Sequence, residues 1–177
     1  MMPGWLLAIA LLLALGGGAR AANENDLKTA YLFNFASLVE WPPSAFAGPL
    51  APVVIGFVGN DAMADQLEAR IGSRKAKGRR VEVRRVSPAD GAALRNCHVL
   101  YLADAEAGRV ETVLREVQGS PVLTVGDAEN FVRRGGMIGF EVQEKSVRFS
   151  ANPRAAKSGG LSLGSDVLRL AREVFSR

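Results

Sequence analysis

The sequence has a single cysteine and a single histidine among its 177 residues. Cys97 therefore has no second cysteine in the chain with which to form an intramolecular disulfide. One Cys and one His also supply too few ligands for a tetrahedral structural zinc site. Cys97 and His98 are adjacent, and neighbouring residues on a strand point to opposite faces, so they do not form a thiolate–imidazole pair. We expect both side chains to be buried in the core.

Motifs that bind cofactors or support hydrolysis are also lacking. Gly160–Gly164 matches the G-x-S-x-G pattern of nucleophile elbows, but His98 lies upstream of it and the preceding segment predicts a helical turn, not a strand. No G-x-G-x-x-G follows the first predicted strand, where Gly56 and Gly59 are a lone pair. We therefore predict that the protein is not an enzyme and that it has no catalytic residues, no metal and no cofactor.

The chain begins with an apolar run, Trp5–Leu15, that is too short to be a comfortable membrane span. Small residues and the tripeptide Ala19-Arg20-Ala21 follow it, which predicts a cleaved signal peptide over residues 1–22, a single exported domain over residues 23–177 and a periplasmic location. No Lys or Arg precedes Trp5, which leaves an uncleaved anchor as the alternative. No cysteine follows the run, so a lipoprotein anchor is not supported.

The charge balance is ordinary apart from one basic segment. The chain has 22 Lys and Arg against 18 Asp and Glu, and loss of Arg20 with the signal leaves 21 against 18, a net charge of +3. Residues 70–85 lack interleaved aromatics, and an exported protein does not meet nucleic acid, so we exclude a nucleic-acid partner. We favour the interpretation that this segment is a solvated loop followed by an edge strand whose arginines prevent pairing with other strands. The alternative is that its positive charges bind an anionic wall polymer, a membrane surface or an acidic partner. The basic residues of this segment are Arg70, Arg74, Lys75, Lys77, Arg79, Arg80, Arg84 and Arg85.

Short apolar segments alternate with helical patterns through most of the chain. The first is Val53–Val58, a fully apolar run between Pro52 and Gly59 that is typical of a central strand buried on both faces. This alternation predicts an α/β domain with a mostly parallel sheet and helices on both faces. Further strands are predicted over Val81–Val86, His98–Leu102 and Pro121–Val125, and helices over Asp61–Ile71 and Ala105–Val117.

The last part of the chain predicts an antiparallel hairpin followed by two helices. Met137–Val142 and Val147–Ala151 alternate apolar and polar residues, so the single domain is expected to carry a C-terminal antiparallel hairpin. Asn152 is a candidate N-cap for a short helix that starts with proline. Ser165 is expected to cap a longer helix that closes the chain, because apolar residues recur at helical spacing as far as Phe175.

Three aspartates, Asp61, Asp104 and Asp127, lie two or three residues after the ends of predicted strands. The carboxyl ends of parallel strands gather ligand-binding groups, so these carboxylates could together hold a hard cation. The chain lacks the paired acidic residue at the first strand that phosphorelay receiver domains have, and an exported protein would not meet a cytoplasmic phosphodonor. Because each aspartate precedes a helical pattern, we favour the interpretation that they are N-caps.

The segment Leu27–Trp41 predicts a helix with more apolar positions than a single stripe requires. Tyr31 and Phe35 belong to the stripe, whereas Phe33 widens it. The helix should end at Trp41, because a residue before proline is pushed out of the α region. The helix is either buried on two sides or partly in contact with a partner, and burial is the favoured interpretation.

Two separated motifs of this chain resemble the YfiR family of small periplasmic regulatory proteins. The first is the helical segment that begins at Lys28 and ends at Glu40-Trp41-Pro42. The two motifs occur in the family's order and cover the predicted exported domain. The second motif is the succession Gly135–Ile138, Val147–Phe149, Asn152 and Leu161–Ala171.

The resemblance implies a repressor that does no chemistry itself. Its implied partner is the periplasmic domain of a membrane diguanylate cyclase, which the protein would hold inactive. This repression would lower cyclic-di-GMP output and restrain biofilm formation. An outer-membrane lipoprotein would relieve the repression. The characterised relatives use disulfides, and Cys97 resembles one of their half-cystines without its partner. Redox control through an internal bridge is therefore in doubt, and Cys97 is either merely buried or paired between the chains of a homodimer.

We predict a recognition surface on the N-terminal helix and the hairpin turn, because the helix has a surplus of apolar positions. The rival prediction is a periplasmic small-ligand-binding or sensor module, with its ligand in the crevice beyond Gly59, Asp104 and Asp127. The predicted partner-binding residues are Phe33, Glu40, Trp41, Glu144 and Lys145.

Overall fold

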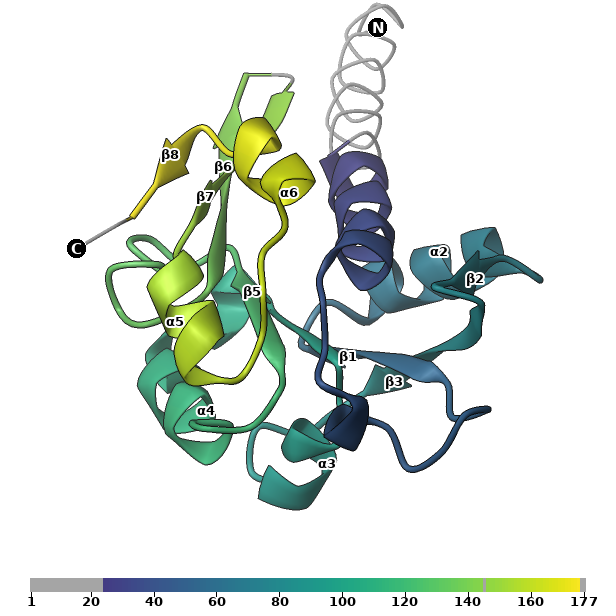
Figure 1. Ribbon diagram of the computed structural model, residues 1–177. Coiled ribbons are helices and arrows are strands. Elements are labelled where there is room, and N and C mark those ends of the chain that lie inside the picture. The colour runs from purple at the N-terminus through teal and green to yellow at the C-terminus, as the bar shows by residue number, and fades with distance from the viewer. Residues whose placement is uncertain (1–23, 145, 176–177) are drawn as a thin grey trace, which may run out of the picture.

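The computed structural model describes residues 24–144 and 146–175, which form one eight-stranded sheet with helices on both faces (Figure 1). Along the sheet the strands follow the order β2-β3-β1-β4-β5-β6-β7-β8. Their bounds are β1 Val53–Val58, β2 Lys75–Ala76, β3 Arg79–Arg85, β4 Val99–Leu102, β5 Leu123–Gly126, β6 Ile138–Gln143, β7 Ser146–Ala151 and β8 Glu173–Val174.

Most neighbouring strands are parallel. β1 lies between β3 and β4 and is parallel to both, and the parallel arrangement continues through β5 and β6. β6 and β7 form an antiparallel hairpin in which Phe140 lies opposite Phe149, and β2 is antiparallel to β3 at the other edge. The prediction of an α/β domain with a mostly parallel sheet and a C-terminal antiparallel hairpin is confirmed.

The helices divide between the two faces of the sheet. The N-terminal helix, which covers residues 24–38 of the described chain, packs together with α2, α5 and α6 in one hydrophobic cluster. α3 and α4 contribute to a second cluster on the opposite face. The remaining bounds are η1 Pro43–Ala45, α2 Asp61–Ile71, α3 Gly91–Arg95, η2 Asp104–Arg109, α4 Val110–Glu116, α5 Pro153–Ser158 and α6 Ser165–Leu170.

β1 contributes side chains to both hydrophobic clusters. Ile55 and Phe57 belong to the cluster under the N-terminal helix, whereas Val54 and Val58 belong to the cluster under α3 and α4. All six residues of the strand are buried. This alternation explains why the sequence of the strand is apolar throughout, and the prediction of a central strand is confirmed.

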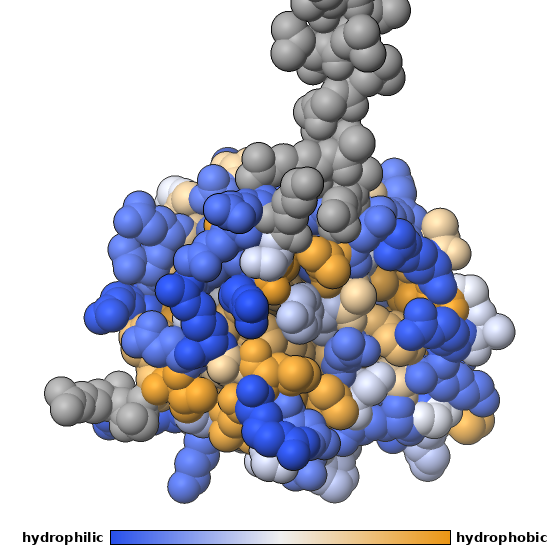
Figure 2. Space-filling view, turned by 90° about the horizontal axis from the view of Figure 1, so that it is seen from above, coloured by the Kyte–Doolittle hydropathy of each residue, from blue (hydrophilic) through white to orange (hydrophobic). Residues whose placement is uncertain are grey.

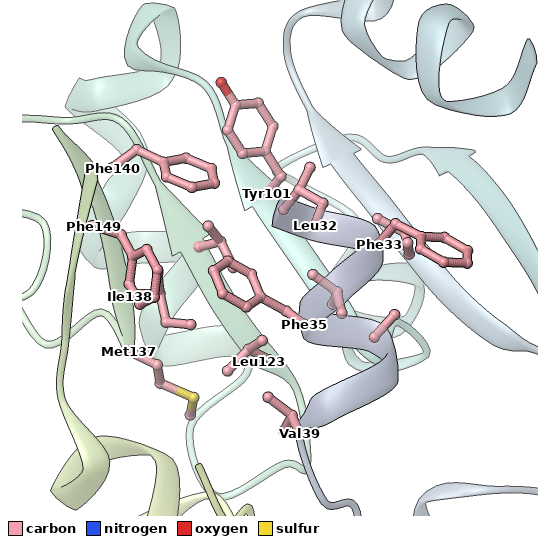
Figure 3. Close-up of a cluster of buried hydrophobic side chains, with 14 of the residues drawn as sticks. Leu32, Phe33, Phe35, Val39, Tyr101, Leu123, Met137, Ile138, Phe140 and Phe149 are labelled. Atoms are coloured by element: carbon pink, nitrogen blue, oxygen red, sulfur yellow. The ribbon is translucent and has the colours of Figure 1, made fainter. Parts of the chain in front are cut away.

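Aromatic side chains hold the N-terminal helix against the hairpin. The ring of Phe35 meets the ring of Phe149 edge-on at a centroid distance of 5.1 Å, and Phe140 lies 6.3 Å from Phe35. Tyr31 stacks on Phe35 at 5.9 Å and lies 5.4 Å from Phe149. Figure 3 shows Phe35 pointing from the helix toward these two rings of β6 and β7. The cluster therefore joins the beginning of the described chain to its last strands.

The end of the chain differs from the sequence-based expectation. α6 stops at Leu170, and β8 pairs in parallel with β7. The backbone N–H of Arg172 donates to the carbonyl of Phe149, and the N–H of Phe175 donates to that of Ala151, each at 2.8 Å. The prediction of one long closing helix was wrong because the open edge of β7 offers backbone acceptors that the helical pattern does not reveal.

The helix caps agree with the sequence in one case and disagree in another. Asn152 caps α5 as predicted, since its side-chain oxygen accepts from the N–H of Ala155 at 2.9 Å. The N-cap of α6 is Gly164, which has no side-chain acceptor, so the assignment of Ser165 as the cap was wrong. The N-terminal helix also ends at residue 38 and not at Trp41.

We expect Phe35→Ala to lower the free energy of unfolding by about 3–5 kcal/mol, because it removes a ring that is 1% exposed at the centre of the aromatic cluster. Urea unfolding followed by circular dichroism measures the loss. Leu170→Ala, at a site that is 55% exposed, serves as the control and should change stability by no more than about 0.5 kcal/mol. Equal losses in the two variants would contradict this account of the core.

Candidate functional site

The candidate site lies at the carboxyl ends of the parallel strands. The strand order reverses around β1, because β3 lies on one side of it and β4 on the other. In doubly wound sheets, ligands bind outside the carboxyl ends of the strands at such a switch point. In this protein Tyr101 of β4 donates its hydroxyl hydrogen bond to Asp127, which directly follows β5.

The N-terminal helix places a lysine at this edge of the sheet. Lys28 Nζ lies 2.9 Å from Asp127 Oδ2 and 2.5 Å from Glu24 Oε1. The side chain of Lys28 is 5% exposed and that of Asp127 is 13% exposed, so the ion pair is largely removed from water. The position that a bound ligand takes in related architectures is therefore filled by the protein's own helix.

Burial and charge act in opposite directions on this cluster. Burial raises the pKa of Asp127, and the Lys28 charge and the hydrogen bond from Tyr101 oppose that shift. Burial disfavours the charged form of Lys28, but Asp127 and Glu24 outweigh it and raise the pKa of the ammonium group. Burial, followed by the charge of Asp127, also raises the pKa of Tyr101, so its hydroxyl stays protonated and donates. The cluster pairs Lys28 and Tyr101 with the same carboxylate oxygen, Asp127 Oδ2, while Asp127 Oδ1 is buried with no hydrogen-bond partner among the described residues.

A second set of polar contacts fixes the same helix to α2. Asp26 Oδ1 accepts from the side-chain amide of Gln66 and lies 2.6 Å from Arg70 Nη2. The guanidinium of Arg74 lies 4.0 Å from the ring centroid of Phe33, which is 8% exposed. The helix is thus covered by the sheet on one side and by α2 on another, which explains its surplus of apolar positions.

Sequence reasoning identified Asp127 but assigned it the wrong role. Asp127 binds Lys28 and Tyr101 and caps no helix. Asn60, one residue before Asp61, caps α2 through the N–H of Met63, and the cap residue of η2 makes no side-chain bond. Sequence reasoning also missed Lys28, although a charged residue four positions before Leu32, on the buried face of an apolar helix, is a recognisable signal.

No group of three His, Cys, Asp or Glu side chains is placed to hold a metal ion within residues 24–144 and 146–175. The hydrogen-bonded carboxylate of Asp127 has the ammonium group of Lys28 as its counter-charge. This arrangement anchors the N-terminal helix to the edge of the sheet.

The structure separates the predicted partner-binding residues into two groups. Glu40 is exposed and pairs through its backbone with Ser162, and Trp41 next to it is half-buried with no hydrogen-bond partner for its buried indole N–H among the described residues. Glu144 lies in the β6–β7 turn, and Lys145 lies outside the described residues. Figure 1 shows this turn at the end of the molecule where the N-terminal helix begins, whereas Glu40 and Trp41 follow the other end of that helix.

His98 is a structural residue of the core. Its Nδ1 accepts from the N–H of Val54 at 3.0 Å, so Nε2 carries the proton and donates to the carbonyl of Ala45, also at 3.0 Å. The imidazole stacks on Phe46 at 4.4 Å and meets Trp41 edge-on at 6.1 Å. The expectation of a packed imidazole is confirmed.

Cys97 is also buried, as expected, with 3% of its surface exposed. Burial raises the pKa of its thiol to about 11, so the group is protonated at neutral pH. Its Sγ lies 3.3 Å from the carbonyl oxygen of Ala93. A protonated, enclosed thiol is a poor nucleophile, which makes Cys97 an inert core residue in this conformation.

The predicted signal peptide lies outside the described residues. Within the described part of the chain, none of the helices combines the length and the apolar character that a membrane crossing requires.

The fold and the site define a single-domain α/β protein whose carboxyl sheet edge is occupied by its own N-terminal helix. Residues 25–172 match the family described as YfiR/HmsC-like. The chain belongs to this family, as the two sequence motifs indicated. Membership indicates a periplasmic regulator.

Two solved structures share the fold. A conserved domain protein from Vibrio cholerae is 15% identical, with a TM-score of 0.53, and the match covers 70% of this chain and 55% of that one. The ABC domain from Streptococcus pneumoniae, solved in complex with L-Trp, is 13% identical, with a TM-score of 0.54 and coverage of 81% and 59%. This chain therefore spans between half and two thirds of each of these proteins, and at such low identity the likeness shows the fold alone.

We expect Lys28→Met to lower the free energy of unfolding by about 3–5 kcal/mol, because it leaves the Asp127 carboxylate buried without a counter-charge, and Asp127→Asn to lower it less, because Lys28 keeps its ion pair with Glu24. The double variant should lose less than the sum of the single losses, and a double-mutant cycle by urea unfolding measures the coupling. The exposed pair Arg169 and Asp166 provides the matched control, whose disruption should cost at most about 1 kcal/mol. Additive losses at Lys28 and Asp127 would contradict the ion-pair assignment.

We expect the stability of the protein to fall as the pH drops below about 6.5, through protonation of its one histidine. Burial, with the charges of Arg79 and Arg84, lowers the pKa of His98 below its ordinary value of 6.5, despite the opposing hydrogen bond to Ala45. Below about pH 6.5 the imidazole of the unfolded chain is protonated while the folded protein keeps His98 neutral, so acid favours unfolding. Urea midpoints at pH 7.5 and 5.5 should differ more for the wild type than for His98→Asn. An imidazole that titrates at or above 6.5 by NMR would refute this expectation.

Proposed function

We propose that this protein is a periplasmic regulator that represses a membrane diguanylate cyclase by binding the cyclase's periplasmic domain. Repression would lower cyclic-di-GMP output and restrain biofilm formation, and an outer-membrane lipoprotein would relieve it. The protein would act without chemistry, by binding one state of the cyclase better than another. A coupling free energy of about 1–3 kcal/mol is sufficient for a change of roughly 5- to 150-fold.

The observation that carries this proposal is the ion pair between Lys28 and Asp127 at the carboxyl edge of the sheet. Because the protein's own helix fills the usual ligand position, a regulatory action through an outer surface is favoured over one through a ligand at the switch point. Family membership supports the same choice. Figure 2, which views the end of the molecule where the N-terminal helix begins, shows apolar side chains near the middle of this face among hydrophilic ones.

The segment around Trp41 is the part of the predicted surface best suited to a partner. Glu40 is exposed, and its backbone is fixed by two hydrogen bonds to Ser162, of 3.0 and 3.1 Å. Trp41 presents a half-buried ring next to it, and its buried indole N–H is a donor without an acceptor in the described chain. Partly exposed tryptophans on rigid backbone are typical of interaction hot spots. Phe33 is 8% exposed, so it would contribute by supporting the helix.

We expect Glu40→Arg to weaken binding to the periplasmic domain of the cyclase by about 10- to 100-fold, because a charge reversal at an interface costs several kcal/mol at most and leaves the fold intact. Calorimetry measures binding, and cyclic-di-GMP levels in cells that co-express both proteins measure repression. Glu173→Arg on β8, also at an exposed acidic residue, is the matched control and should bind like the wild type. Full repression by Glu40→Arg would remove this surface from the proposal, and absence of binding by the wild type would remove the function.

A small-ligand module is the second candidate, and one cavity favours it. The loop after β5 and the outer face of β6 and β7 enclose about 340 Å³, lined in part by Asp127, Arg133, Phe140 and Glu141. The structural neighbour from Streptococcus pneumoniae was solved with L-Trp. A thermal-shift screen of amino acids separates the two candidates, since a ligand at 100 times its dissociation constant stabilises the folded state by about 2.7 kcal/mol.

A further inference from the structure

The loop between η1 and β1 presents an unusually exposed leucine. Residues 48–51 form a turn that is closed by a hydrogen bond of 3.1 Å from the N–H of Ala51 to the carbonyl of Gly48. Leu50 occupies this turn after Pro49 and is 92% exposed. Among the described residues it is the most exposed of the large hydrophobic side chains. We refer to residues 48–51 as the Leu50 turn.

The half-buried side chain of Arg79 holds the Leu50 turn in place. Nη1 of Arg79, the first residue of β3, lies 2.9, 2.9 and 2.7 Å from the carbonyl oxygens of Gly48, Pro49 and Ala51. The same guanidinium lies 3.9 Å from the ring centroid of Phe46. These contacts order a turn that has almost no apolar packing for its leucine. The exposed position of Leu50 is therefore a defined feature of the fold and not the result of a loose loop.

The Leu50 turn adjoins the basic edge of the sheet, formed by β2, β3 and the turn between them. Figure 1 shows the loop before β1 and the β2–β3 turn on the same side of the molecule. Lys75 and Lys77 are exposed and make no ion pair within the described chain. The remaining arginines of the segment have local partners: Arg70 pairs with Asp26, Arg80 and Arg84 with Glu82, Arg85 with Asp65 and Glu68, and Arg74 stacks on Phe33.

The chemistry of this surface fits a lipid headgroup layer better than a protein. A standard protein interface buries about 800 Å² of each partner around an apolar core, which one exposed leucine does not supply. The other exposed large hydrophobic residues of the described chain, Val142, Leu170 and Val174, belong to β6, α6 and β8, away from the β2–β3 edge. One apolar side chain combined with cations that meet lipid phosphates gives weak, reversible attachment to an anionic bilayer, with each cation contributing about 1 kcal/mol.

We propose that the Leu50 turn and the basic edge form a docking surface for an anionic phospholipid membrane. Leu50 enters the headgroup layer, while Lys75 and Lys77 contact lipid phosphates. Attachment would hold the protein at the membrane surface without a membrane-spanning segment. The proposal is independent of cyclase repression, because it concerns a different surface from the one around Trp41 and vesicle binding is measured without the cyclase.

Sedimentation with vesicles of phosphatidylglycerol and phosphatidylcholine tests this surface. The protein used is residues 23–177, which contain both hydrophobic clusters of the fold and omit the apolar N-terminal run. The wild type should bind anionic vesicles, should not bind pure phosphatidylcholine, and should dissociate as salt rises. Lys75→Gln with Lys77→Asn should lower partitioning about 25-fold, at roughly fivefold per cation. Leu50→Ser should lower it about tenfold.

Matched control variants exist elsewhere on the chain. Arg154 and Lys157 are exposed on α5 and make no side-chain ion pair within the described residues, so their double substitution by Gln removes the same charge from another place. Leu170→Ser removes an exposed leucine from α6. Both controls should bind vesicles like the wild type. Because all the substituted sites are exposed, circular dichroism should show unchanged folding for every variant.

Two results would overturn the proposal. One is equal binding to neutral and anionic vesicles, or losses in the control variants as large as those in the Leu50 and lysine variants. The other is absence of vesicle binding by the wild type. If Leu50→Ser then also loses cyclase binding, this surface is a protein interface; if cyclase binding stays intact, the proposed repression still stands.

Discussion

An ion pair taken out of water, Lys28 with Asp127, constrains how the first helix of this protein meets its sheet. Each charge is costly to bury alone, so the helix can dock only in the register that brings the ammonium group to the carboxylate. The aromatic rings of Phe35, Phe140 and Phe149 supply the attraction in that register. Apolar contacts thus provide most of the stability, while the ion pair selects one arrangement among those that the apolar surface would allow.

This docking changes the use of a widespread architecture. Doubly wound sheets commonly keep the carboxyl ends of their strands open for a ligand. In this protein the first turns of a helix close that edge, with Tyr101 and Lys28 both bound to Asp127 Oδ2. Contacts that signal to another molecule then have to lie on the outer surface, which agrees with membership of a family of regulators. The sheet and its two hydrophobic clusters act as a rigid support for segments such as Glu40-Trp41 and the Leu50 turn.

Local sequence patterns succeeded where a residue's environment depends on its near neighbours. The all-apolar β1 strand and the alternating β6–β7 hairpin were predicted in their correct places, and Asn152 was recognised as a cap because its acceptor bonds lie within one turn. Predictions failed where the partner is distant. Asp127 was assigned to a local cap, whereas its counter-charge lies 99 residues away, and the helical pattern up to Phe175 did not reveal the open edge of β7.

The sequence by itself determined the α/β class, the elements that form the sheet and the family, because these follow from hydrophobic period and from short motifs. It did not determine how the N-terminal helix is used, or which polar groups meet at the edge of the sheet. Only the tertiary structure shows that Lys28 pairs with Asp127 at the carboxyl edge of the sheet, and that Arg79 fixes the turn in which Leu50 is exposed to solvent. The reason is physical: burial and charge pairing depend on distances between residues far apart in the chain, which no local pattern contains.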